Sequence, residues 1–97
     1  YDLYKGTFDI RPALETNVPD DLDCRCEIQS IPEGVKVTIN PALMPYVASR
    51  TPNKIRRLLR QKATRPEIVI LALNVNGREI TDPSALGLKE QYRKLML

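Results

Sequence analysis

The chain has no histidine and no tryptophan, and Phe8 is its only phenylalanine. Histidine is the side chain that most often serves as a general base and as a metal ligand, so its absence disfavours catalysis. The four glycines are scattered singly, which excludes a glycine-rich loop for a nucleotide phosphate. No hydrophobic run approaches the roughly 20 residues that a membrane-spanning helix needs. We therefore expect a protein that is not an enzyme, holds no metal or cofactor and does not insert into a membrane.

Cysteine is also scarce, since the chain has only Cys24 and Cys26. In an extended chain these two side chains point the same way, with Cα atoms about 6.5–7 Å apart, which is a poor geometry for a disulfide. A metal site would need further ligands that the chain does not offer as histidine or cysteine. We expect both cysteines to be buried strand residues, and an intracellular, reducing compartment.

The 97 residues suit one domain, and the formal charge of +3 is unevenly distributed along them. Residues 1–33 hold eight acidic and three basic side chains, a net charge of −5. Residues 34–97 hold twelve basic and four acidic side chains, a net charge of +8. The basic part of the chain is therefore the part that could attract an anionic partner.

The middle of the chain predicts a hairpin followed by a helix. Residues 24–29 and 34–39 alternate between apolar and polar side chains, as half-buried strands do, and Pro32-Glu33-Gly34 supplies turn chemistry between them. Asn40-Pro41 predicts a short helical turn, which Pro45 would limit. The helix proper is expected from Thr51 as its cap and Pro52 at its first position to Ala63, with an apolar face of Ile55, Leu58, Leu59 and Ala63.

The flanking segments are predicted as strands and connectors. Residues 1–10 have the composition of a strand that Gly6 interrupts, and residues 67–74 form a dense apolar run typical of a central strand. Residues 11–23 are expected to form a connector. Its acidic side chains could hold a cation, lie against the basic helix or, as we favour, be solvated; they are Asp20, Asp21 and Asp23.

The last stretch, residues 88–97, allows two interpretations. Leu88, Tyr92, Leu95 and Met96 fit one face of a helix. A short final strand would instead complete a sheet. Local periodicity favours the helix, so a second helix at the end of the chain is the alternative to a terminal strand.

The order of these elements resembles the β-grasp arrangement of ubiquitin-like domains. Val75-Asn76-Gly77-Arg78-Glu79-Ile80 resembles the turn after the family's third strand, and residues 82–90 resemble its next small turn. The resemblance implies an α+β fold over residues 24–97, a mixed sheet with one main helix packed on it, and a final strand at Tyr92–Leu97. Residues 1–23 would add an N-terminal strand and the acidic connector.

The same resemblance implies a non-catalytic interaction module within a larger protein. The chain has no terminal Gly-Gly, so nothing favours a conjugated modifier or a sulfur carrier. Some β-grasp relatives, the TGS domains of RNA-handling proteins, contact RNA. The fold alone does not choose between protein and RNA partners.

The strongest local feature is a run of seven cations in residues 50–65, with no acidic residue among them. On a helix, several of these cations would point away from the apolar face, where they would attract phosphates or an acidic protein surface. The alternative is an ordinary solvated helix face, and few aromatic side chains lie near to stack with bases. We expect a module that binds a protein partner or its parent chain, with RNA or another polyanion as the alternative, through Arg50, Lys54, Arg56, Arg57, Arg60, Lys62 and Arg65.

Overall fold

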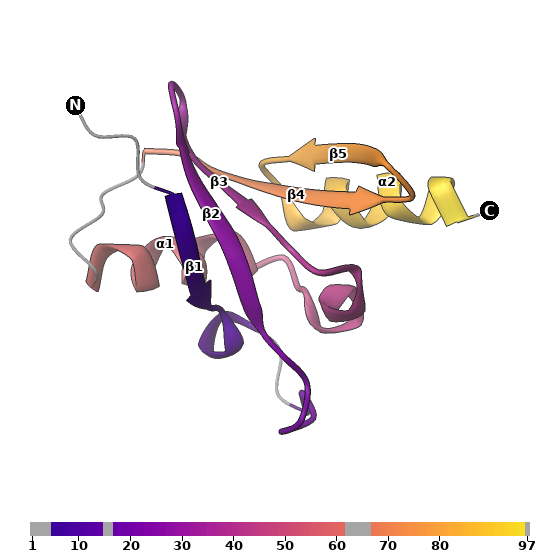
Figure 1. Cartoon of the computed structure of the whole chain (residues 1–97), viewed down its shortest axis with the longest axis horizontal. Coiled ribbons are helices and arrows are strands. Elements are labelled where there is room, and N and C mark those ends of the chain that lie inside the picture. The colour runs from indigo at the N-terminus through magenta and orange to yellow at the C-terminus, as the bar shows by residue number, and fades with distance from the viewer. Residues whose placement is uncertain (1–4, 15–16, 62–66, 97) are drawn as a thin grey trace.

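The structure is a computed structural model that describes residues 5–14, 17–61 and 67–96. These residues form an α+β fold, a five-stranded mixed sheet with helices packed on it (Figure 1). The strands, which lie side by side in chain order, are β1 (Lys5–Asp9), β2 (Arg25–Ile31), β3 (Gly34–Thr38), β4 (Val69–Val75) and β5 (Arg78–Asp82). The helices are α1 (Thr51–Gln61) and α2 (Ala85–Met96), with short 3₁₀ helices η1 (Arg11–Ala13) and η2 (Pro41–Tyr46).

The predicted hairpin is confirmed as β2 and β3. The two strands are antiparallel, and Ile31 pairs with Gly34 around the two-residue turn Pro32-Glu33. Gly34 is required where β3 begins, because a Cβ atom there would collide with the backbone carbonyl of Ile68. The N–H of Val35 donates to that same carbonyl at 3.0 Å, so the start of β3 lies against the chain that leads into β4.

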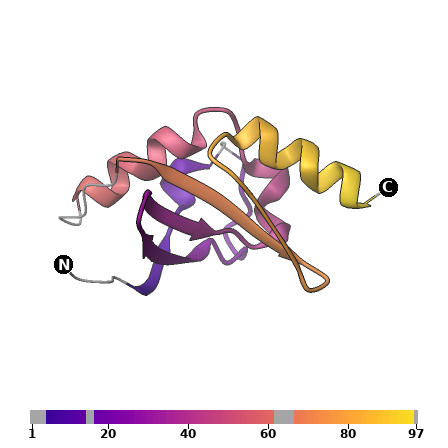
Figure 2. The same cartoon turned by 90° about the horizontal axis from the view of Figure 1, so that it is seen from above.

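Strand β4 is the predicted apolar strand, and it pairs in parallel with β3 through Val35–Val69 and Val37–Leu71. A parallel pair needs a crossover connection, and α1 lies within it. Both α1 and α2 lie on the same side of the sheet, as the view from above shows (Figure 2). One face of the sheet is therefore covered by helices.

Strands β1, β2 and β3 follow this division in their side-chain burial. In β2, for example, Cys26 and Ile28 are buried while Glu27 and Gln29 are exposed. The buried side chains of β1 to β4 join those of both helices in one hydrophobic core, and the partly buried Ile80 of β5 packs against it. The opposite face of the sheet is left open and carries mostly polar side chains, which is the alternation expected for a sheet with one solvated face.

The N-terminal strand is confirmed as part of this sheet. Strand β1 is antiparallel to β2, with Phe8 opposite Cys26, and Phe8 belongs to the core. Residues 1–4, which complete the predicted strand, lie outside the described residues. The division of the chain at residues 23 and 24 stays a prediction.

The start of α1 differs from the prediction by one residue. The N–H of Lys54 donates to the carbonyl of Arg50 at 3.0 Å, which places Arg50 rather than Thr51 at the cap. Thr51 is buried, and its Oγ1 accepts a hydrogen bond from the N–H of Ala48 at 2.9 Å. Thr51 thus stabilises the loop that precedes α1. The sequence pattern alone does not distinguish this role from that of a cap.

The described residues end in α2, so the terminal strand expected at Tyr92–Leu97 is wrong for residues 92–96, and Leu97 lies outside the described residues. Ser84 caps α2, because its Oγ accepts from the N–H of Gly87 at 2.9 Å. Ala85 and Leu88 are the buried residues of α2, which supports the alternative of a second helix. Membership of the ubiquitin-like superfamily stays a prediction, without the final strand that the resemblance implied.

Candidate binding surface on the first helix

Helix α1 presents most of the predicted cations to solvent. Ile55 and Leu59 are buried against the sheet, which turns the opposite side of the helix outward. On a helix of 100° per residue, the cations lie on this outward side. We define the basic face as the four exposed side chains Arg50, Lys54, Arg57 and Arg60. Two further predicted residues, Lys62 and Arg65, lie outside the described residues.

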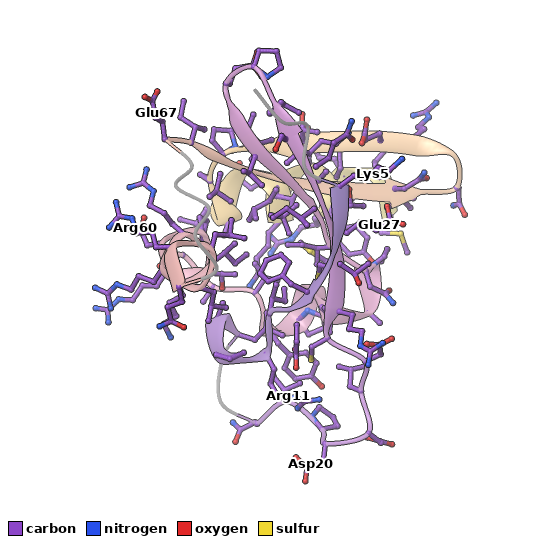
Figure 3. All side chains as sticks on the ribbon, turned by 60° about the vertical axis from the view of Figure 1, so that its left-hand side comes forward. Lys5, Arg11, Asp20, Glu27, Arg60 and Glu67 are labelled. Carbon is purple, nitrogen blue, oxygen red and sulfur yellow. The ribbon has the colours of Figure 1, made fainter. Side chains whose placement is uncertain are left out.

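The cations of the basic face have no carboxylate partner among the described residues. The ion pair found in this part of the chain joins the Lys36 Nζ to the Glu79 Oε1 at 2.9 Å, on the open face of the sheet. Figure 3 shows the Arg60 side chain projecting away from α1 into solvent. The basic face is therefore a surface whose positive charge is not neutralised by neighbouring carboxylates of the described chain.

Arg56 belongs to the same run of cations but has a different role. It is half-buried, and its Nη2 donates a hydrogen bond to the backbone carbonyl of Glu67 at 2.6 Å. This contact ties α1 to the chain just before β4. Its partner lies eleven residues ahead, beyond the reach of helical periodicity, so the sequence did not distinguish Arg56 from its exposed neighbours.

The acidic connector is anchored by Arg11, an arginine that no local sequence pattern distinguishes. The Arg11 guanidinium donates to the backbone carbonyls of Pro19 at 3.1 Å, Asp20 at 3.4 Å and Leu22 at 2.6 Å. Because the anchor uses backbone carbonyls, the carboxylate of Asp20 stays exposed. A long-range contact from a single arginine carries no local sequence signal.

The carboxylates of this connector do not gather into a metal site in the described part of the chain. Asp20, Asp21 and Asp23 are exposed, and no three potential metal ligands are grouped in residues 5–14, 17–61 and 67–96. Asp20 lies at the lower tip of the molecule in Figure 3, away from Arg60, and the described residues form no ion pair between connector and α1. The described carboxylates of the connector therefore do not neutralise the basic face.

Both cysteines are free and buried, as the alternation predicted. The Cys24 Sγ lies 3.6 Å from the carbonyl of Leu22, and the Cys26 Sγ lies 3.7 Å from the carbonyl of Cys24. Burial raises the pKa of both thiols, and it raises the pKa of Cys26 from 9.0 to about 12. Reactive cysteines need an accessible thiolate, so these buried thiols act as apolar side chains of the core.

Hollows border the helices in the described part of the chain. An apolar groove of about 450 Å³ lies between η2 and α2, with Met44, Tyr92 and Met96 among its lining and the cations Lys89 and Arg93 beside them. A second hollow of about 370 Å³ lies at the start of α1, and Arg50 and Lys54 line part of it. Each joins segments far apart in the chain, which is why neither could be predicted from local patterns.

No helix among the described residues has the length and apolar character needed to cross a bilayer. Comparison of the chain with protein families, with curated proteins and with solved structures gives no match.

Proposed function

We propose that the chain is a non-catalytic binding module of a larger protein or assembly, which engages an acidic surface of a protein partner through the basic face of α1. The observation that carries this proposal is the exposure of Lys54, Arg57 and Arg60 on one helix and of Arg50 at its cap, without a carboxylate partner in the described residues. Positive charge that the fold does not neutralise attracts carboxylates from outside.

The size of α1 suits a single protein contact. Eleven residues at 1.5 Å each make a helix about 16 Å long, so its cations lie within about two Debye lengths at physiological salt. Exposed charge pairs contribute about 0.2–1 kcal/mol each. Four such pairs favour a transient complex whose association rate depends on salt.

The uncharged surroundings also favour a protein over a nucleic acid. The residues that α1 exposes besides its cations are Asn53 and Gln61, and neither can stack on a base. Proteins that bind single strands usually combine cations with aromatic platforms. An acidic protein surface needs only the cations.

RNA is the second candidate, because the hollow at the start of α1 places Arg50 and Lys54 beside a space that a phosphate group could enter. RNA binding through four cations would give a log–log salt slope of about −2.8, at about −0.7 per phosphate on a single strand. No retardation of single-stranded RNA at about 50 mM salt would reject this candidate.

The protein proposal is tested by affinity capture from nuclease-treated extract with the full parent chain. We compare the unaltered protein with a variant carrying Lys54→Gln, Arg57→Gln and Arg60→Gln. A matched control carries Arg25→Gln, Arg78→Gln and Lys94→Gln, which removes the same charge from exposed positions elsewhere.

A stoichiometric protein partner should be retained by the unaltered chain and by the control, and lost by the α1 variant. Recovery only when nucleic acid is intact would reject the protein partner. Equal loss in both variants would show that net charge, and not the basic face, governs binding.

A further inference from the structure

Strand β1 lies at the edge of the sheet, and the described residues place no strand on its outer side. The direction of its backbone groups follows from the register. The N–H of Ile10 donates to the carbonyl of Cys24 at 3.0 Å, so every second residue back from Ile10, namely Phe8 and Gly6, also faces β2. The backbone N–H and C=O groups of Lys5, Thr7 and Asp9 therefore face outward.

The side chains of these three residues also share a side of the molecule. Lys5, Thr7 and Asp9 are exposed and alternate with Gly6 and the buried Phe8, so they lie on the open face of the sheet. Figure 3 shows Lys5 on the side of the sheet away from α1, together with Glu27. The edge strand thus carries a positive charge at its start and a negative charge at its end, with Thr7 midway.

This arrangement is complementary to itself. When two copies of such a strand run antiparallel with Thr7 opposite Thr7, each Lys5 stands directly opposite Asp9 of the other copy. Directly opposed side chains of opposite charge stabilise an antiparallel pair, and like charges destabilise it. A parallel pairing in register would instead place Lys5 against Lys5.

We propose that the outer edge of β1 is a self-association surface, through which two copies of this chain form a twofold-symmetric pair with a sheet continuous across both. The pairs Lys5–Asp9, Thr7–Thr7 and Asp9–Lys5 each exchange two N–H···O bonds between the copies. Gly6 lies opposite Phe8 of the second copy on the covered side, and its missing side chain leaves room there.

Lys5 on the edge strand does not prevent this pairing. Lysine on an edge strand commonly prevents pairing with other chains, because it leaves a charge without a partner. Here Asp9 supplies that partner, and only in the symmetric antiparallel register. The proposal does not depend on the function assigned to α1, since no cation of the basic face belongs to β1.

The test is sedimentation velocity of the full chain from micromolar to millimolar concentration at low salt. The unaltered protein should form dimers as concentration rises. Lys5→Asp places Asp against Asp across the pair, and Asp9→Lys places Lys against Lys, so each variant alone should stay monomeric.

Mixing the two single variants restores both opposite-charge pairs, so the mixture should form a heterodimer that neither variant forms alone. The Asp9 Oδ1 accepts a hydrogen bond from the N–H of Arg11 at 2.8 Å, so circular dichroism must show that Asp9→Lys remains folded. Thr7→Pro is the second variant: it removes an outward N–H while leaving the bonds to β2, and it should abolish dimers. A monomer at every concentration, or dimers that persist in both charge variants and in Thr7→Pro, would overturn the proposal.

Discussion

The basic face of α1 and the open face of the sheet both carry several charges, but the charges are arranged and paired differently on the two surfaces. On the open face the two signs are interspersed, and Lys36 pairs with Glu79 at 2.9 Å. On α1 every charge is positive, and the described residues offer those cations no carboxylate partner. The small net charge of +3 hides this difference. A surface attracts a charged partner when its charges have one sign and are left without partners within the fold.

The largest expected effect on the free energy of unfolding comes from shortening a buried side chain on the inner side of α1. Leu59 is 1% exposed and holds α1 on the sheet, so Leu59→Ala should lower the free energy of unfolding by about 2–5 kcal/mol. Thr81→Ala, at an exposed position on the open face, should change it by less than about 0.5 kcal/mol. Urea denaturation measures both. Equal effects would contradict the division into a covered and an open face.

The covered side of the sheet should also make stability sensitive to alkali. The pKa of Cys26 is about 12 in the folded protein against 9.0 without burial, so the unfolded chain loses its proton first. The contribution of the Cys26 thiol to the free energy of unfolding is therefore fully present below pH 9. It decreases between pH 9 and 12, by about 1.4 kcal/mol per pH unit for one thiol.

Urea denaturation at pH 8, 9 and 10 measures this slope. Cys26→Ala is the reference, because it lacks this thiol alone. It should show a shallower decline than the unaltered protein. Parallel curves would mean that burial does not hold the thiol in its protonated form.

Two adjacent arginines separate stability from binding. Arg56 donates to the Glu67 carbonyl at 2.6 Å, so Arg56→Gln should cost about 1 kcal/mol of stability. Arg57 is exposed without such a contact, so Arg57→Gln should leave stability within about 0.5 kcal/mol and weaken capture of the partner. Thermal denaturation and the capture assay distinguish them. The reverse pattern would show that the two roles are assigned to the wrong residues.

The smallest effect is expected at the paired charges of the open face. The side chains of Lys36 and Glu79 are 25% and 49% exposed, so their ion pair should contribute no more than about 1 kcal/mol. Lys36→Gln should reduce stability by that amount at low salt and by less at high salt. Partner capture should be unchanged. A clear loss of binding would place the interface on the open face instead.

Local pattern was sufficient to predict the hairpin, the central strand β4 and the apolar face of α1. These elements depend on residues within a few positions of one another, such as the alternation around Cys26 and the spacing of Ile55 and Leu59. The end of the chain was harder, because the helix pattern and the family resemblance disagreed there. The helix pattern was right, and Ser84 supplies the cap that begins α2.

The candidate site was predicted only in part. Periodicity identified the exposed cations of α1, but it could not separate Arg56, whose partner is the carbonyl of Glu67. It also missed Arg11, which holds the acidic connector through three carbonyls. Contacts between a side chain and a distant backbone carbonyl leave no periodic signal, so they emerge only once the chain is folded.

The most direct test of the central claim is photo-crosslinking from the two compared surfaces in nuclease-treated extract. A photoreactive amino acid is placed at position 57 on the basic face, and separately at position 81 on the open face. Both residues are exposed, so neither replacement should disturb the core. The account predicts a crosslinked protein partner from position 57 and none from position 81. A crosslink from position 81 alone would contradict it.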